Sequence, residues 1–225
     1  EGFDDLAIFP YVSSVNVACG GHAGDAATMD RTVAEAAERG LAIGAHPSYP
    51  DRAGFGRKDL DLPLEEIVRS VREQLDALAT ICARRDVRLT HVKPHGALYN
   101  RAARDSDLAR ALAETVRAFD PSLALVGLAG SLSIVAARAA GLRALEEGFA
   151  DRRYLADGTL VPRNLEDAVF ESLDLALAQG LALARGGPFP AVDGSPLVLR
   201  VDTLCIHSDT PGASAFARAL STALR

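Results

Sequence analysis

Cysteine is scarce in this chain. Cys19, Cys82 and Cys205 are far apart, odd in number and form no CxxC pair. A disulfide framework or a zinc knuckle is therefore not indicated, and buried thiols are the simpler interpretation. Long apolar runs are also lacking: 48% of the residues are hydrophobic, but charges recur too often for a membrane span. The start of the sequence has no signal-peptide pattern, so we expect a cytoplasmic protein.

Two kinds of anion-binding sequence are missing as well. The 24 Lys and Arg residues are outnumbered by 30 Asp and Glu, which gives a net charge of −6. Basic residues form no cluster with interleaved aromatics, so nucleic acid is not an expected partner. No GxxxxGK[ST] motif occurs, so a bound nucleotide would not be held by a P-loop. The turn GLAGS (127–131) is a weak signal for backbone N–H groups that bind phosphate.

What the chain does contain is a short apolar run followed by a helical stretch, repeated along its 225 residues. This pattern predicts strands at 15–19, 41–45, 87–93, 123–127, 142–147 and 201–206, and helices at 25–39, from 63, 107–119, 131–140, 167–184 and from 213. Such alternation is typical of an α/β fold with a parallel sheet, either open or closed into a barrel. No linker or composition shift interrupts it, so we predict a single domain over residues 1–225.

Residue types at the ends of two helices support these assignments. Asp25 is placed to cap the helix at 25–39, and Gly40 is placed to end it. Met29, Val33 and Ala37 are predicted to form the apolar face of this helix. The next helix begins at Pro63 and carries Ile67, Val71, Leu75 and Leu78 at spacings of three or four residues.

All five histidines fall at or near the carboxyl end of a predicted strand: His22, His46, His91, His95 and His207. The cluster EEGFADRRY (146–154) follows another strand. In α/β folds these strand ends form one face, and substrates bind there. The sequence therefore predicts that the histidines share one rim, which is the candidate active site.

The stretch HVKPHGALYN (91–100) concentrates polar side chains. Alternation along a strand puts His91 and Lys93 on one face. Pro94 lacks an N–H, so we expect it to end the strand ladder, with His95 and Gly96 beginning a loop. A lysine on the inner face of a buried strand requires an anion nearby, and a bound carboxylate or phosphate would serve.

Each motif also has a purely structural interpretation. GGHAGD could be a turn that ends in the cap Asp25, and Arg57 in PSYPDRAGFGR could be a solvated charge on a surface loop. DRRY could be an ion-pair network, and in HSDTPG Asp209 could cap the last helix. A divalent metal ion is a further possibility, because histidines from several strand ends can converge, with Asp25 or Asp209. The candidate ligands are His22, His46, His91 and His95.

Five motifs, in order, are ACGGHAGD, IGAHPSYPDRAGFGR, HVKPHGALYN, FADRRYLADGTLVPR and LCIHSDTPGA. They resemble the LamB/YcsF family over nearly the whole chain. The resemblance implies a seven-stranded β/α barrel, TIM-barrel-like and of the glycoside hydrolase/deacetylase type. Only six strands are predicted here, and family members carry an acidic strand ahead of the EGF with which this sequence begins. We therefore expect the first strand of the barrel to be absent from this sequence.

The resemblance also implies an activity. Family members are the A subunit of an ATP-dependent 5-oxoprolinase, which opens the lactam of 5-oxoproline to glutamate together with subunits B and C. ATP is the implied cofactor, with a divalent metal as a possible second one. The hypothesised catalytic residues are His22, Asp25, His91, Lys93 and His95, and the hypothesised substrate- or phosphate-binding residues are His46, Tyr49, Arg57, Tyr99, Asn100, Asp151, Arg152, His207 and Asp209.

Within these sets, Lys93, Arg57 and Arg152 are proposed to hold phosphate and carboxylate groups, and His91, His95 or Asp25 to act as the base for water. Two alternatives remain open. One is a metal-dependent hydrolase or deacetylase that acts alone, and the other is a non-catalytic subunit that binds substrate for its partners.

Overall fold

The computed structural model describes residues 5–163, 165–208 and 212–225. Contacts within the chain define two compact units. Unit 1 contains residues 12–127 and 131–144, and unit 2 contains residues 5–11, 128–130 and the described residues from 145 to 225. Each unit is described by itself below. The assignment of residues 1–225 to a single domain stays a prediction.

Six strands form the main sheet, in the order β1-β2-β3-β4-β5-β8. Their bounds are β1 Ser14–Ala18, β2 Ala42–His46, β3 Leu89–Val92, β4 Ala124–Leu128, β5 Arg143–Phe149 and β8 Thr203–Cys205. The pairs β1–β2, β2–β3, β3–β4 and β5–β8 are parallel. The predicted α/β class is thus confirmed. Among the described residues this sheet has six strands, so the seven-strand count of the barrel is not confirmed.

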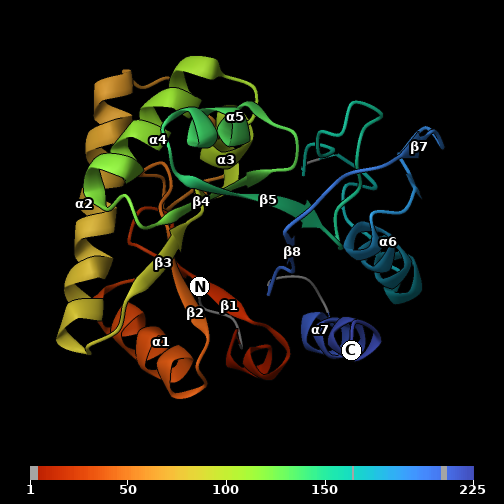
Figure 1. Ribbon diagram of the computed structural model, residues 1–225, viewed down its shortest axis with the longest axis horizontal. Coiled ribbons are helices and arrows are strands. Elements are labelled where there is room, and N and C mark those ends of the chain that lie inside the picture. The colour runs from red at the N-terminus through yellow and green to blue at the C-terminus, as the bar shows by residue number, and fades with distance from the viewer. Residues whose placement is uncertain (1–4, 164, 209–211) are drawn as a thin grey trace. The chain divides into compact units, whose positions relative to one another are not determined.

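Unit 1 combines the first four strands with five helices (Figure 1). The helices are α1 Ala26–Glu38, α2 Leu64–Arg84, α3 Gly96–Ala102, α4 Ser106–Phe119 and α5 Leu132–Ala139. Helix α1 packs on β1 and β2 and against α2; α2 in turn packs against α4, and α4 against α5. The four apolar residues predicted for the inner face of α2 are all buried. In α1, however, Ala37 is exposed and Ala36 is buried, so that part of the predicted face is wrong by one residue.

The segment after β3 differs from the prediction in one way, because Gly96 begins the helix α3 instead of a loop. β3 ends at Val92, ahead of Pro94 as expected. Beyond it the N–H of Lys93 still donates to Ala45, and the N–H of His95 donates to Pro47, one residue past β2. Parallel pairing uses every second N–H of a strand toward a given neighbour, so Pro94, which has no N–H, falls between these two bonds.

Unit 2 contains the described parts of two short 3-10 turns (Asp5–Ala7 and Phe9–Tyr11), the helices α6 Leu173–Arg185 and α7 Ala213–Ala223, and an antiparallel ribbon of β6 Phe189–Pro190 and β7 Pro196–Leu197. The ribbon lies in a connection for which no strands were predicted. Helix α6 begins six residues later than expected from 167–184. Residues 165–168 form bends and turns, and Val169 forms an antiparallel bridge with Arg152. The core of unit 2 includes Ala150, Ala176, Phe216 and Leu220.

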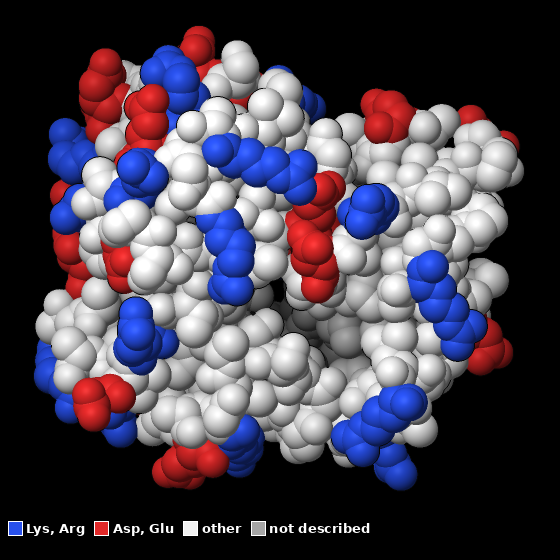
Figure 2. Space-filling view, viewed as in Figure 1, with Lys and Arg blue, Asp and Glu red and all other residues white. Residues whose placement is uncertain are grey.

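Acidic and basic side chains are interspersed on the face shown in Figure 2, which displays no broad patch of one sign. In the part of the chain that the structure describes, no helix combines the length and the apolar character needed to cross a bilayer. On the face shown in Figure 2, charge does not mark out a site.

Candidate functional site

Three histidines of unit 1 lie at the carboxyl ends of three neighbouring strands. His22 is in the loop after β1, His46 is the last residue of β2, and His95 is the N-cap of α3 just beyond β3. Their solvent-exposed fractions are only 2%, 8% and 8%. Because β1, β2 and β3 are adjacent and parallel, the three strand ends deliver these side chains to one place.

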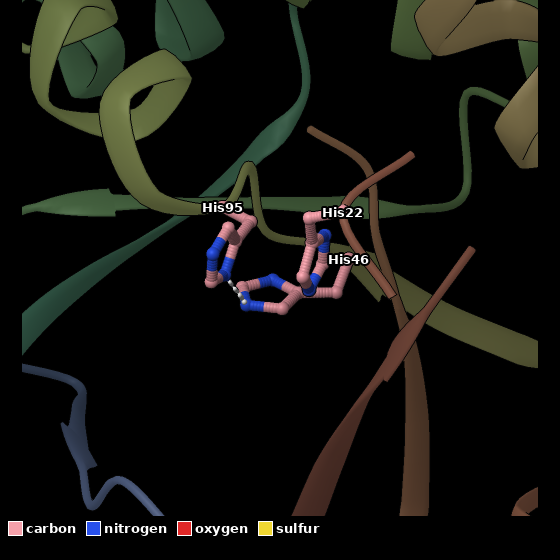
Figure 3. A group of neighbouring side chains, drawn as sticks. All are labelled: His22, His46 and His95. Atoms are coloured by element: carbon pink, nitrogen blue, oxygen red, sulfur yellow. Dashed lines mark hydrogen bonds between the residues drawn. The ribbon is translucent and has the colours of Figure 1, made fainter. Parts of the chain in front are cut away.

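The three imidazole rings are in contact (Figure 3). His22 and His95 are stacked, with ring centroids 3.7 Å apart and planes within 3°. His46 meets both edge-on, at centroid distances of 5.6 Å and 4.8 Å. One ring nitrogen from each histidine lies within 4.8 Å of the other two. We call these three residues the histidine cluster.

The loop 47–57, singled out in the sequence as a possible functional loop, packs on the histidine cluster. The ring of Phe55 contacts His22 and His95 edge-on, at 5.3 Å and 5.5 Å. Phe55 has a φ of 55°, which non-glycine residues rarely adopt and which is often found at functional sites. At Gly56 a side chain would come within 3.0 Å of both histidines. The backbone of this loop is thus shaped around the two stacked rings.

Gln74 of α2 holds the start of this loop, and the sequence analysis missed it. Its side-chain amide accepts from the N–H of Ser48 at 2.9 Å and donates to the carbonyl of Ser48 at 2.8 Å. Gln74 is buried, and a buried amide is retained where its hydrogen bonds are made. The sequence did contain a signal for this role: Gln74 is a polar residue directly before Leu75, beside the apolar residues of α2.

Tyr49 is buried in the same loop, yet its hydroxyl is turned to other partners. It donates to Asp59 at 3.2 Å and accepts from the guanidinium of Arg101 at 3.3 Å. Burial raises the pKa of this phenol. Arg101 acts in the opposite direction, and the negative charge of Asp59 raises the pKa further. These contacts anchor the loop to α3. The substrate-binding role hypothesised for Tyr49 stays a prediction.

Lys93 follows β3 directly and is 5% exposed. Its ammonium group lies 5.7 Å from the ring centroid of Tyr99, a distance suited to a cation–π contact. Tyr99 is buried and Asn100 is exposed on α3. Arg57 is also exposed and lies 4.9 Å from the ring centroid of Phe55. Of the residues predicted to bind an anion or substrate here, Lys93 and Tyr99 lie next to each other, whereas Asn100 faces solvent.

His91 does not belong to the histidine cluster. Its Nε2 lies 3.0 Å from the side-chain oxygen of Asn16, across β2. Gly44, which pairs with both residues in the sheet, leaves room for the ring. Burial, together with the charges of Lys93 and Arg143, lowers the pKa of His91 to about 4. This histidine is therefore neutral at pH 7, and it is no part of the metal-ligand group found among the described residues.

Asp25 takes the role that its structural interpretation predicted. It is exposed, and its carboxylate accepts a hydrogen bond of 2.7 Å from the N–H of Thr28 at the start of α1. This bond, more than any other contact, holds the pKa of Asp25 below its ordinary value. The expected convergence of Asp25 with the histidines is not observed, because its backbone position directs it to the helix end.

Unit 2 contains a second buried polar group. Asp151, 2% exposed, accepts a hydrogen bond of 2.9 Å from Nδ1 of His207, and Sγ of Cys205 lies 3.9 Å from Nε2 of the same ring. Burial alone would lower the pKa of His207, but its interactions with Cys205 and Asp151 outweigh burial and raise it to about 10. His207 is therefore a cation at pH 7. Asp209 lies outside the described residues.

Arg152 is buried beside Asp151, but its guanidinium binds the protein itself. It donates to the carbonyls of Ala168 at 3.2 Å and Val161 at 2.6 Å. Burial and the charge of Arg163 lower its pKa. These bonds fasten the irregular segment between β5 and α6. The phosphate-binding role hypothesised for Arg152 stays a prediction.

Known proteins resemble this chain over almost its whole length. The model of the LamB/YcsF family matches residues 2–225. A Bordetella pertussis protein, named as the A subunit of 5-oxoprolinase, is 52% identical over 98% of this chain and 88% of its own length. A Chloroflexus aggregans protein of the same name is 53% identical over 96% and 86%.

A solved structure gives the same answer. The crystal structure of a lactam utilization protein from Thermus thermophilus superposes with a TM-score of 0.90 at 44% identity, and covers 98% of this chain and 88% of the other. Sequence and structural comparisons therefore agree. The chain belongs to the LamB/YcsF family.

Proposed function

We propose that this protein is the A subunit of an ATP-dependent 5-oxoprolinase, which opens 5-oxoproline to L-glutamate together with subunits B and C. The observation that carries the proposal is the 52% identity, over nearly the whole chain, to a relative named as that subunit. Because the relatives' name denotes one lettered subunit, it further supports a complex of several chains. The buried polar groups are the features that this chemistry would use.

A lactam resists hydrolysis because its amide is resonance-stabilised and its amine is a poor leaving group. Transfer of the γ-phosphoryl group of ATP to the lactam oxygen, with release of ADP, makes the ring carbon electrophilic. Water then adds to that carbon, and the ring C–N bond breaks as the nitrogen takes up a proton. The resulting acyl phosphate is hydrolysed to glutamate and phosphate. Such a route requires cations for the phosphate and carboxylate groups and a base for water.

In this proposal Lys93 supplies a fixed positive charge in unit 1, where it is buried beside Tyr99. His95 is the preferred base, because it is buried against His22 and His46 at the strand ends. Buried charges and paired histidines are the groups that catalytic sites tune most strongly.

One observation favours a second candidate function, that of a metal-dependent hydrolase acting alone. The histidine cluster offers three nitrogen ligands within one small volume, as catalytic zinc sites do. This candidate predicts hydrolysis of amides without ATP and without partner subunits.

The assay that tests the proposal measures glutamate released from 5-oxoproline in the presence of ATP and of subunits B and C. The matched variants are His95→Gln and Arg110→Ala, the latter on the exposed face of α4. We expect His95→Gln to lose at least about 100-fold in rate, the size typical for removal of a general base, and Arg110→Ala to keep the wild-type rate. Unchanged activity of a folded His95→Gln protein would show that the cluster is not the catalytic site.

A further inference from the structure

The histidine cluster has hydrogen bonds that fix the protonation of two of its rings. Nδ1 of His46 lies 2.6 Å from the carbonyl oxygen of Lys93. Nε2 of His95 lies 2.9 Å from the carbonyl oxygen of Phe55. A carbonyl oxygen can only accept, so each of these nitrogens carries the hydrogen and donates it. The strained backbone of Phe55 (φ 55°) is what places one of the two carbonyls.

The other nitrogens of the same two rings face each other. Nε2 of His46 is 3.0 Å from Nδ1 of His95 (Figure 3). A neutral imidazole has one N–H and one lone pair, and the N–H groups are already directed at the carbonyls. If both rings were neutral, the lone pair on Nε2 of His46 would face the lone pair on Nδ1 of His95 at hydrogen-bonding distance. In this buried place the two lone pairs would repel each other. A positive species between them, a proton or a metal ion, removes this repulsion.

The surroundings match the known pattern of metal-binding histidines. A ligating histidine donates its second ring N–H to a backbone carbonyl or a carboxylate, which fixes the ring and leaves the other nitrogen for the metal. His46 and His95 both follow this pattern. His22 brings the third ring, stacked on His95, with a nitrogen within 4.8 Å of the other two ligand atoms.

The kind of ligand selects the kind of metal. Among the residues that the structure describes, the group contains three imidazoles and no carboxylate. Nearby Cys19 stays a neutral thiol, because burial raises its pKa to about 12, and its Sγ–H donates to the carbonyl of Val17. Imidazole ligands suit Zn²⁺ and its neighbours Co²⁺, Ni²⁺ and Cu²⁺, whereas Mg²⁺ and Ca²⁺ prefer oxygen.

We propose that His22, His46 and His95 bind a divalent transition-metal ion, with Zn²⁺ as the best fit. Zinc–nitrogen bonds of about 2.0–2.1 Å put tetrahedral ligands about 3.3 Å apart. The 3.0 Å separation of His46 and His95 is close to this value. The ring of His22, stacked on His95, has to tilt to bring its nitrogen to the same ion. Three protein ligands leave a fourth position for water or a substrate oxygen. This site goes beyond the proposed function, since the ATP-driven route does not itself require a metal at these residues, and it changes one part of it. A His95 whose Nδ1 ligates the metal and whose Nε2–H donates to Phe55 cannot also take the proton of water, so the metal site replaces the assignment of His95 as the base.

The test is a measurement of metal binding, independent of catalysis. The purified protein is stripped with a chelator and titrated with Zn²⁺, with the dissociation constant obtained by competition against a fluorescent chelator. Substitution of Co²⁺ adds a visible absorption spectrum that reports tetrahedral coordination. The variants are His46→Gln and His95→Gln, with His91→Gln as the matched control, since that histidine lies in the same unit but outside the cluster.

We expect one equivalent of Zn²⁺ per chain, an affinity weakened at least about 100-fold in His46→Gln and His95→Gln, and unchanged stoichiometry in His91→Gln. A wild-type protein that binds neither Zn²⁺ nor Co²⁺ above background would overturn the proposal and leave a shared proton as the bridge between the rings. Equal binding by the folded cluster variants would overturn it too. If those variants do not fold, the number of histidine nitrogens around the wild-type metal is measured by X-ray absorption. Three nitrogens support the site, and two or fewer refute it.

Discussion

Replacing Gly44 by alanine tests whether the ring of His91 occupies its position because Gly44 has no side chain. Gly44 has ordinary extended backbone, so alanine is conformationally acceptable there. Its added Cβ, however, would lie 2.5 Å from Cε1 of His91 and nearer still to Nε2 and Cδ2. Ordinary contacts between such atoms are about 3.5–4.0 Å. The ring must therefore move by more than about 1 Å and lose its 3.0 Å bond to Asn16.

The expected cost follows from these two effects. Overpacking in a rigid core typically costs about 1–3 kcal/mol, and loss of one hydrogen bond costs about 0.5–1.5 kcal/mol. We therefore expect Gly44→Ala to lower the free energy of unfolding by about 2–4 kcal/mol. Urea denaturation followed by circular dichroism measures this change.

A double-mutant cycle shows whether the ring is the cause. In a His91→Ala background the clash is gone, so we expect Gly44→Ala to cost at least about 1.5 kcal/mol less than in the wild type. The control is Gly187→Ala, where the nearest atom is 3.8 Å from the new Cβ; we expect a change within about 1 kcal/mol there. The reasoning is refuted if Gly44→Ala costs the same with and without the ring of His91.

Two further predictions concern Phe55, which has a left-handed backbone conformation, and the pair formed by His207 and Asp151 in unit 2. Phe55→Gly and Phe55→Ala both remove the ring, but glycine adopts the φ of 55° without strain, so Phe55→Gly should be more stable in urea by about 1 kcal/mol; a more stable alanine variant would contradict this. The His207–Asp151 pair stabilises the protonated imidazole, whose pKa is raised to about 10. Since the unfolded value is about 6.5, the stabilisation is complete below about pH 6.5 and is lost as the pH rises toward 10. His207→Gln should thus lower the free energy of unfolding by about 1.5–3 kcal/mol at pH 6 and much less at pH 10, and a pH-independent difference would count against the pair.

The strands of the main sheet were predictable because their runs are short, rich in apolar or β-branched residues and bounded by glycine or proline. β1 and β4 are within one residue of the ranges read from sequence. Helix α3 was missed for the opposite reason: its seven residues begin with glycine, only two positions after Pro94. Nothing local distinguishes such a segment from a loop, and its formation depends on packing against α4.

The candidate site was predictable in position but not in its contacts. Placement at strand ends correctly associated His22, His46 and His95. It could not separate His91 from them, because its partner Asn16 is 75 positions away in sequence and is reached only through the register of β1, β2 and β3. Likewise, the carbonyls of Val161 and Ala168 that Arg152 binds could not be foreseen from the sequence. Side-chain partners of this kind are properties of the folded chain.

The most direct test of the central claim is an omission experiment on glutamate formation from 5-oxoproline by the wild-type protein. Subunits B and C and ATP are each left out in turn, and ADP is measured beside glutamate. The account predicts glutamate and ADP in equal amounts when all components are present, and no glutamate when this protein, either partner or ATP is missing. Glutamate formed without ATP, or no glutamate from the complete mixture, would contradict it.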